Sequence, residues 1–203
     1  MSVTVEKINK TFFEEAIDYA SYRTLIKDLL EVHKTTGPNQ SEAMVAYTKM
    51  NDQRMNRWDK TLKMDDELVA LLQLSQPMNW LVITEAWCGD AAQSIPVINR
   101  IAEQNDGINV RFIFRDDHLD IMDEYLTNGA RSIPILIAMD EEFIELGTWG
   151  PRPDPAQQLV MDAKQNPEKY EGGYAEAVHK WYAKDKAKTI QEEFKALIKG
   201  WNQ

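Results

Sequence analysis

The sequence predicts an α/β protein in which helices flank a mixed central sheet, and three kinds of segment support this class. Helical periodicity fills the first third of the chain, short β-branched runs alternate with a helix in the middle, and helical patterns return at the end. The 203 residues are 43% hydrophobic and 28% charged, with 9 Gly and 8 Pro. This composition excludes collagen-like, low-complexity and wholly disordered chains, and the length is enough for a sizeable core.

The first third of the chain reads as a helical layer, because apolar residues recur at helical spacing through residues 11–74. Turn-forming residues at 35–39 interrupt this spacing, so a second helix is expected over residues 41–61. A third, short helix is expected over residues 65–74, and Pro77 closes it.

The middle of the chain predicts strands separated by helices. The apolar, β-branched run at residues 80–84 is typical of a strand buried on both faces. A helix with an apolar inner face and a second strand over residues 109–114 follow it, so this segment forms a βαβ unit. A helix at residues 119–126 and a strand at residues 133–139 come next.

The last part of the chain begins with a hairpin and ends in helices. A turn is expected at residues 140–142, with a strand over residues 143–146. The segment 149–153 is rich in turn residues and forms either a stiff wall beside a binding groove or a loop that caps the sheet. Helical patterns at residues 155–164 and 174–197 complete the chain.

No internal repeat and no Gly/Ser-rich linker divides the chain, so we expect one structural domain with three parts. Residues 77–153 form the α/β core. Residues 1–76 form a helical N-terminal extension packed on that core, and residues 154–203 form C-terminal helices.

Charge and cysteine content narrow the function classes. The net charge is −10, from 23 Lys and Arg against 33 Asp and Glu, and no long basic cluster occurs, so neither a nucleic acid nor a membrane is an expected partner. Residues 1–13 lack a secretory apolar core, and no apolar run reaches the length of a membrane span. Cys88 is the single cysteine, which excludes an internal disulfide and is typical of a reducing, cytoplasmic setting.

Cys88 is the candidate catalytic residue, because it lies where a buried strand ends and a helix begins. The free backbone N–H groups at the start of that helix favour the thiolate form of a nearby thiol. In open α/β sheets, ligands also bind at loops that follow the carboxyl ends of strands. Position and chemistry therefore point to the same residue.

The segment Trp87-Cys88-Gly89-Asp90-Ala91 resembles the active-site motif of thioredoxins, in which Trp-Cys-Gly-x-Cys opens the first core helix. The order strand, motif, helix, strand, helix, then Ile133-Pro134 before a hairpin, is similar to the thioredoxin fold over residues 79–150. The helical N-terminal layer and the motifs around positions 131–134 and 146–153 resemble a bacterial subgroup of thioredoxin-like proteins of about this length.

The resemblance implies a thioredoxin fold and a set of site residues. It implies that Pro134 is cis, lies beside the Cys88 sulfur and presents backbone to an extended partner. The residues expected to contact a substrate are Trp87, Gly89, Asp90, Arg131, Ile133 and Pro134.

Three positions depart from the thioredoxin pattern. Ala91 replaces the second, resolving cysteine, so the dithiol–disulfide cycle cannot operate. By the resemblance, the buried proton-accepting carboxylate of thioredoxins corresponds to Val82, and its accompanying lysine corresponds to Phe112. The proton-handling pair is therefore replaced by apolar side chains.

Two charged residues near the motif act on the Cys88 thiol in opposite directions. Arg131 is expected on the loop facing Cys88, where it would pair with a carboxylate of a small thiol or favour the thiolate, unless it is an ordinary surface ion-pair partner. Asp90 repels a thiolate and raises the thiol pKa. The balance between Asp90 and the helix N-terminus stays open at the level of sequence.

Two functions from different classes follow. The first is a monothiol enzyme that exchanges disulfides through Cys88, with a disulfide-containing protein or a low-molecular-weight thiol as partner and an external thiol as resolver. The alternative is a redox-inactive binding module that uses the groove beside Pro134, with Cys88 as a relic or a small packed side chain. Other one-cysteine chemistries on this fold, such as a peroxidase, a transferase or a cluster carrier, are also open.

No cofactor and no metal is expected. The run at residues 116–118, Asp-Asp-His, is more typical of a turn and helix N-cap than of a zinc site, which draws on three or four spaced ligands. No Gly-rich phosphate loop, Ser/His/Asp arrangement or nucleotide fingerprint occurs.

Overall fold

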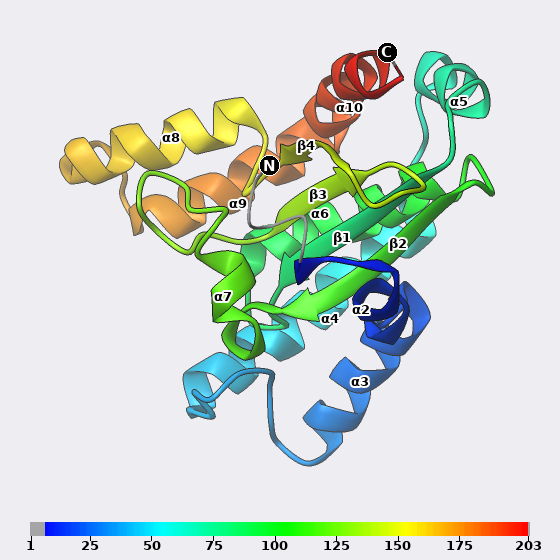
Figure 1. The fold of residues 1–203 in the computed structure, drawn as a ribbon. Helices are drawn as coiled ribbons and strands as arrows, with labels where there is room; N and C mark the ends of the chain where they lie inside the picture. Colours follow the sequence, from blue (N-terminus) through cyan, green and yellow to red (C-terminus); the bar gives the residue numbers. More distant parts are fainter. Residues whose placement is uncertain (1–6, 203) are drawn as a thin grey trace.

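A buried strand, β1 (Met78–Thr84), lies inside a four-stranded sheet of order β2-β1-β3-β4 (Figure 1). The parallel neighbour is β2 (Ile108–Phe114), and the antiparallel neighbour is β3 (Ile135–Met139), which pairs in turn with β4 (Glu145–Trp149). The computed structural model describes residues 7–202. This mixed sheet between helices confirms the predicted fold class.

The helices between β1 and β2, and at the end of the chain, cover one face of the sheet. The helix α6 (Gly89–Ala102) joins β1 to β2, and α10 (Lys188–Trp201) packs against β1 and β4. Phe194 of α10 contacts the indoles of Trp80 and Trp149 at ring-centroid distances of 5.5 and 5.7 Å. In Figure 1, α2 and α7 lie on the opposite side of the sheet from α6.

The N-terminal region forms the helical layer that the sequence predicts, and its start also extends the sheet. Ile17 exchanges two backbone hydrogen bonds with Phe112, N–H to O at 3.2 Å and 2.8 Å, and so covers the outer edge of β2. Asp18 and Asp65 begin two of the helices, because each carboxylate accepts a backbone N–H of the first turn. The helices are α2 (Lys10–Glu15), α3 (Tyr19–Glu31), α4 (Glu42–Thr61) and α5 (Asp66–Gln73).

Val82 and Phe112, which replace the proton-handling pair of thioredoxins, are direct partners in the parallel β1–β2 register. Their side chains therefore share one face of the sheet. Both are buried, and Tyr22 of α3 stacks on Phe112 with ring centroids 5.4 Å apart. An apolar and aromatic contact fills the place where the resemblance implies charges.

The last strand and the preceding helix differ from the sequence prediction. The strand predicted over residues 143–146 begins at Glu145, because the turn is longer than expected: the Asp140 carboxylate accepts the backbone N–H groups of Glu142 and Ile144. Phe143 has a left-handed backbone (φ 62°), which a strand residue does not adopt. The helix predicted over residues 119–126 is a single turn, α7 (Leu119–Met122), and continues as irregular turns.

The C-terminal helices are three rather than two. After α8 (Asp154–Gln165), the pattern at residues 174–197 divides into α9 (Gly173–Asp185) and α10. Lys186 and Ala187 both adopt left-handed backbone conformations (φ 56° and 61°), and Asp185 accepts the backbone N–H of Thr189 to start the new helix. Neither Gly nor Pro marks this break, so periodicity alone predicts one continuous helix.

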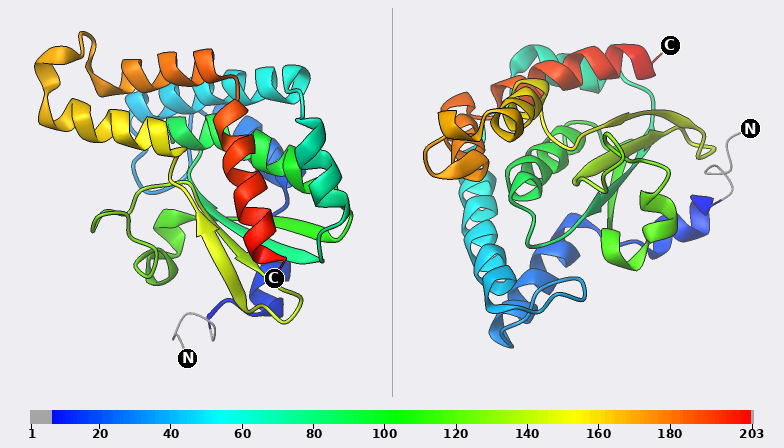
Figure 2. Two further views of the ribbon diagram at one scale, coloured as in Figure 1. Left: turned by 90° about the horizontal axis from the view of Figure 1, so that it is seen from above. Right: turned by 90° about the vertical axis from the view of Figure 1, so that its left-hand side faces the viewer.

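A small apolar cluster of Val160, Val178 and Tyr182, separate from the main core, packs α8 against α9. Figure 2 shows these two helices side by side. Within residues 7–202, no helix combines the length and the apolarity that crossing a bilayer requires.

The substitution Phe112→Ala should lower the free energy of unfolding by about 3–5 kcal/mol, because it removes a fully buried ring from the junction of α3 and the sheet. Urea denaturation measures this loss. The matched control is Leu74→Ala at a side chain that is 84% exposed, where a change below about 0.5 kcal/mol is expected. Equal effects of the two substitutions would contradict the packing described for Phe112.

Candidate functional site

The candidate site is the junction of β1 and α6, where Cys88 is the N-cap residue of α6. The Cys88 backbone N–H donates to the carbonyl of Glu85 at 3.1 Å, which forms the turn after the strand. The thiol sulfur accepts the backbone N–H of Ala91 at 3.5 Å. The thiol itself donates to the carbonyl of Ile133 at 3.3 Å, and the residue is only 8% exposed.

The pKa of the Cys88 thiol is raised to about 12, mainly by burial and secondly by the negative charge of Asp90. The backbone N–H groups of Ala91 and Asp90 lower it, as the helix N-terminus predicts, but this effect is the smaller one. The sequence leaves open whether Asp90 or the helix N-terminus dominates the Cys88 pKa. In the structure the thiol is protonated at neutral pH. A protonated thiol is also the form that can donate to Ile133.

Two cis peptide bonds lie next to each other beside the thiol: Ile133–Pro134, which precedes β3, and Gly150–Pro151, which follows β4. Gly150 passes so close to Pro134 that a Cβ on Gly150 would lie 2.2 Å from the Pro134 carbonyl oxygen. Gly150 also has a φ of +123°, so only glycine suits this position. Ile133 and Pro134 are both buried under these contacts.

Asp90 is the centre of a polar cluster whose members lie far apart in the sequence, so the sequence does not predict it. Its carboxylate accepts hydrogen bonds from Arg152 Nε at 3.0 Å, from Arg152 Nη2 at 2.5 Å and from the Tyr182 hydroxyl at 3.0 Å. Arg152 also donates to Gln157 at 2.6 Å, and the Arg152 and Asp90 side chains are only 12% and 15% exposed. The cluster joins the N-terminus of α6 to the turn after β4 and to α9.

Arg152 belongs to the turn-rich segment 149–153, which is predicted to form either a wall beside a groove or a loop that caps the sheet. Nothing in that segment predicts that Arg152 pairs with Asp90. Tyr182 carries no sequence signal, because it lies on an ordinary amphipathic helix far along the chain. A contact across 92 positions depends on how the C-terminal helices fold back.

Gly89, the residue between the thiol and Asp90, is covered by two helices from opposite ends of the chain. A Cβ on Gly89 would lie 2.8 Å from Cε1 of His179 on α9 and 3.6 Å from Nη1 of Arg54 on α4. Burial and the charge of Arg54 lower the pKa of His179. The helices α4 and α9 therefore close over the start of α6.

Trp87 and Arg131 lie on the rim of the site, tied together by Arg115. The Arg115 guanidinium lies 4.8 Å from the centroid of the half-buried Trp87 ring and donates to the Arg131 carbonyl at 3.3 Å. The Arg131 side chain makes a two-point ion pair with Asp123, at 2.6 and 2.8 Å, and both side chains are 46% exposed. The structure thus directs the Arg131 charge to Asp123.

A second buried carboxylate, Glu85, lies directly before the motif. It accepts hydrogen bonds from the Thr36 hydroxyl and, at 3.0 Å, from the backbone N–H of Asp116, while the Thr36 oxygen accepts the Ala86 N–H at 2.9 Å. Burial raises the pKa of Glu85, and the neighbouring Asp116 charge contributes to the rise. These bonds tie the loop before α4 to the carboxyl ends of β1 and β2, and they use part of the Asp-Asp-His run at residues 116–118.

Replacing Asp90 with Asn should lower the pKa of Cys88 below the value of about 12, because it removes a negative charge that disfavours the thiolate. Thiolate absorbance as a function of pH measures the shift. Asp123→Asn, which removes an equally charged but exposed carboxylate, is the control and should leave the Cys88 pKa unchanged. Equal titration midpoints in wild type and Asp90→Asn would contradict the assignment of Asp90.

Glu85→Gln should weaken the pH dependence of stability. Since the folded-state pKa of Glu85 lies above the ordinary value of 4.5, its contribution is fully present below that pH and is lost as the pH rises through the folded pKa. Urea denaturation at about pH 4 and about pH 7 should therefore show a larger loss of unfolding free energy for wild type than for the variant. The control is Glu142→Gln, at an exposed turn, which should lose as much unfolding free energy between the two pH values as wild type. An equal loss in all three proteins would contradict this role of Glu85.

Comparisons with known proteins place this geometry in a family. The family model described as Thioredoxin matches residues 37–166, which is more than half of the chain. A protein of unknown function from Pseudomonas aeruginosa, solved by crystallography, has a TM-score of 0.63 and 17% identity over 95% of this chain and 98% of that one. An HIV epitope-scaffold gives 0.60 and 18%, over 93% and 95%. No curated protein matches the sequence.

At these identities the two structures show a shared fold and nothing about activity. The match of the family model is independent of them and includes β1, the Cys88 junction and the segment around Pro134. By that match, the chain belongs to the thioredoxin family.

Proposed function

We propose that this thioredoxin-family protein is a redox-inactive binding module, in which Cys88 acts as a neutral hydrogen-bond donor and an extended polypeptide is held at the surface beside Pro134. The observation that carries the proposal is the state of the thiol. It is 8% exposed, its pKa is raised to about 12, and it donates to the Ile133 carbonyl.

Disulfide exchange requires a thiolate, a resolving thiol and a proton acceptor, and this site offers none of the three. The attacking species is a thiolate, and a thiol with so high a pKa is almost entirely protonated at neutral pH. The position of the resolving thiol is Ala91, and the partners Val82 and Phe112 offer no proton acceptor. Each of the three changes removes a different part of the exchange cycle, while the fold around it is retained.

The partner surface that we propose is the rim formed by Trp87, Arg115, Arg131 and Ser132. Trp87 is half-buried, Ser132 is partly exposed, and Arg115 fixes the indole and the Arg131 backbone to each other. A rigid aromatic ring beside a backbone segment suits recognition of an extended chain. Cys88 contributes by holding the Ile133 carbonyl in place behind this rim.

A second candidate function is monothiol exchange with an external resolving thiol. The observation that favours it is the position of the sulfur, at the N-cap of α6 and within 3.3 Å of the carbonyl that precedes Pro134. In this reaction the Cys88 thiolate attacks a mixed disulfide between a protein and a small thiol, forms a disulfide with the small thiol and releases the protein thiolate. A second small-thiol thiolate then attacks that disulfide and displaces the Cys88 thiolate, so that the protein is reduced and two small thiols leave as one disulfide.

We further propose a cytoplasmic setting, because a single buried thiol suits a reducing compartment. The resemblance to a bacterial subgroup of thioredoxin-like proteins supports a bacterial origin. We also propose that residues 1–76, 77–153 and 154–203 act as one structural domain. Contacts of both flanking regions with the β1–α6 junction, through Thr36, Arg54, His179 and Tyr182, support that organisation.

The rate of Cys88 alkylation by iodoacetamide as a function of pH separates the two functions. For the binding module, the native protein should label slowly with a midpoint near 12, whereas the urea-unfolded chain should label with a midpoint of about 8.5. Fast labelling of the native protein with a midpoint below about 8.5 would overturn the binding proposal and favour exchange.

Partner capture under reducing conditions provides the second arm of the test. Cys88→Ser should retain bound polypeptide partners, and Trp87→Ala should lose them. The matched control is Tyr174→Ala, which removes a half-exposed aromatic ring on α9 and should retain them. Capture that occurs only in a parallel experiment without reductant, requires Cys88 and is released by a reducing thiol would instead support exchange.

A further inference from the structure

A cavity of about 440 Å³ lies between the C-terminal end of α4 and the junction of α9 with α10. Its lining includes Arg57, Trp58, Leu62, Lys63, Ala183 and Lys186. The left-handed pair Lys186–Ala187 breaks the C-terminal helix at this point and turns Lys186 to the cavity side of the junction. The volume lies within the range of small-molecule sites.

The charge of this cavity is opposite to that of the whole protein. Arg57, Lys63 and Lys186 contribute three positive charges, and none of the lining residues is acidic, although the chain has a net charge of −10. Within residues 7–202, none of these three side chains makes a hydrogen bond or an ion pair with another residue. Lys195 of α10, by contrast, is paired with Asp65, Glu67 and Glu192.

The positive charge extends one turn further along α4. Burial lowers the pKa of Arg54, and the neighbouring Arg57 charge lowers it further. The two cations lie three positions apart on α4 and repel each other, and the charge of Asp90 offsets part of this repulsion at Arg54. An anion bound at Arg57 would relieve this repulsion.

The lining is also apolar. Trp58 is one of the lining residues although it is only 6% exposed; its indole N–H donates to Gln93 at 2.7 Å, and the Arg57 guanidinium lies 5.3 Å from its ring centroid. Leu62 and Ala183 add further apolar surface. A purely polar anion would leave this part of the lining without a partner.

We infer that the cavity between α4 and the α9–α10 junction binds a small amphiphilic anion, with a phosphate or carboxylate group at Arg57, Lys63 and Lys186 and an apolar body against Trp58 and Leu62. The site is separate from the Cys88 junction and does not depend on the function proposed there. Arg57 supplies the flat, two-point donor that such anionic groups prefer, and the two lysines supply flexible point charges.

Calorimetric titration of the full chain with phenyl phosphate and with phenylacetate tests the site, and amide NMR shifts locate it. At least one of the two probes should bind and shift the amides of the lining residues, and the tighter of them identifies the anionic group. Inorganic phosphate lacks the apolar ring and benzyl alcohol lacks the anionic group, so each should bind at least about tenfold more weakly. Absence of binding by both probes, or equal binding of inorganic phosphate as an adventitious ion only, would overturn the inference.

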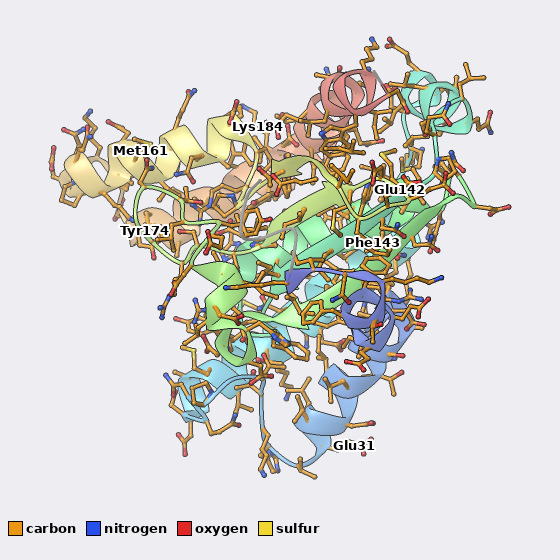
Figure 3. The ribbon with its side chains drawn as sticks, viewed as in Figure 1. Glu31, Glu142, Phe143, Met161, Tyr174 and Lys184 are labelled. Carbon is orange, nitrogen blue, oxygen red and sulfur yellow. The ribbon has the colours of Figure 1, made fainter. Side chains whose placement is uncertain are left out.

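Charge variants connect the binding to these residues. Lys63→Gln and Lys186→Gln should each weaken binding about tenfold, and Lys63→Arg should restore it. The matched control is Lys184→Gln, which removes the same charge from α9 at an exposed side chain that does not line the cavity. Figure 3 labels Lys184. Circular dichroism checks that each variant is folded. Equal affinity in Lys63→Gln, Lys186→Gln and wild type would contradict the site.

Discussion

The carboxylate of Asp90 accepts three hydrogen bonds at the N-terminus of α6, and these bonds fix the turn after β4 and the helix α9 to the Cys88 junction. Arg152 reaches it from the turn after β4, and Tyr182 reaches it from α9. A carboxylate at a helix start is already favourable, and a buried ion pair with an additional hydroxyl donor is directional as well. Burial is the main cause that keeps the Cys88 thiol protonated, and the Asp90 charge adds to it.

The central part of the fold could be predicted from sequence because its signals are local. A buried strand needs a continuous apolar run, and Cys88 lies where such a run gives way to helical spacing. The division of residues 174–197 could not be predicted, since Lys186 and Ala187 have no intrinsic preference for a left-handed backbone. The start of β4 was missed for a related reason, because a single Asp140 carboxylate lengthens the turn.

The candidate site shows the same division between local and long-range information. The motif identifies Cys88 and Asp90 from consecutive residues, but the ionisation of the thiol depends on what covers it. His179, Arg54 and Tyr182 come from α9 and α4, and no spacing in the sequence brings them to the start of α6. Helix position alone favours a thiolate, and burial of the sulfur together with the charge of Asp90 reverses that expectation.

The hydrogen bond from the Cys88 thiol to the Ile133 carbonyl also bears on chemical durability. Peroxides and other mild oxidants react with thiolates, and access to the sulfur sets the rate together with the ionised fraction. A covered, protonated sulfur is a poor target on both counts. The only cysteine of the chain is therefore protected from sulfenic acid formation and from cross-linking of two copies.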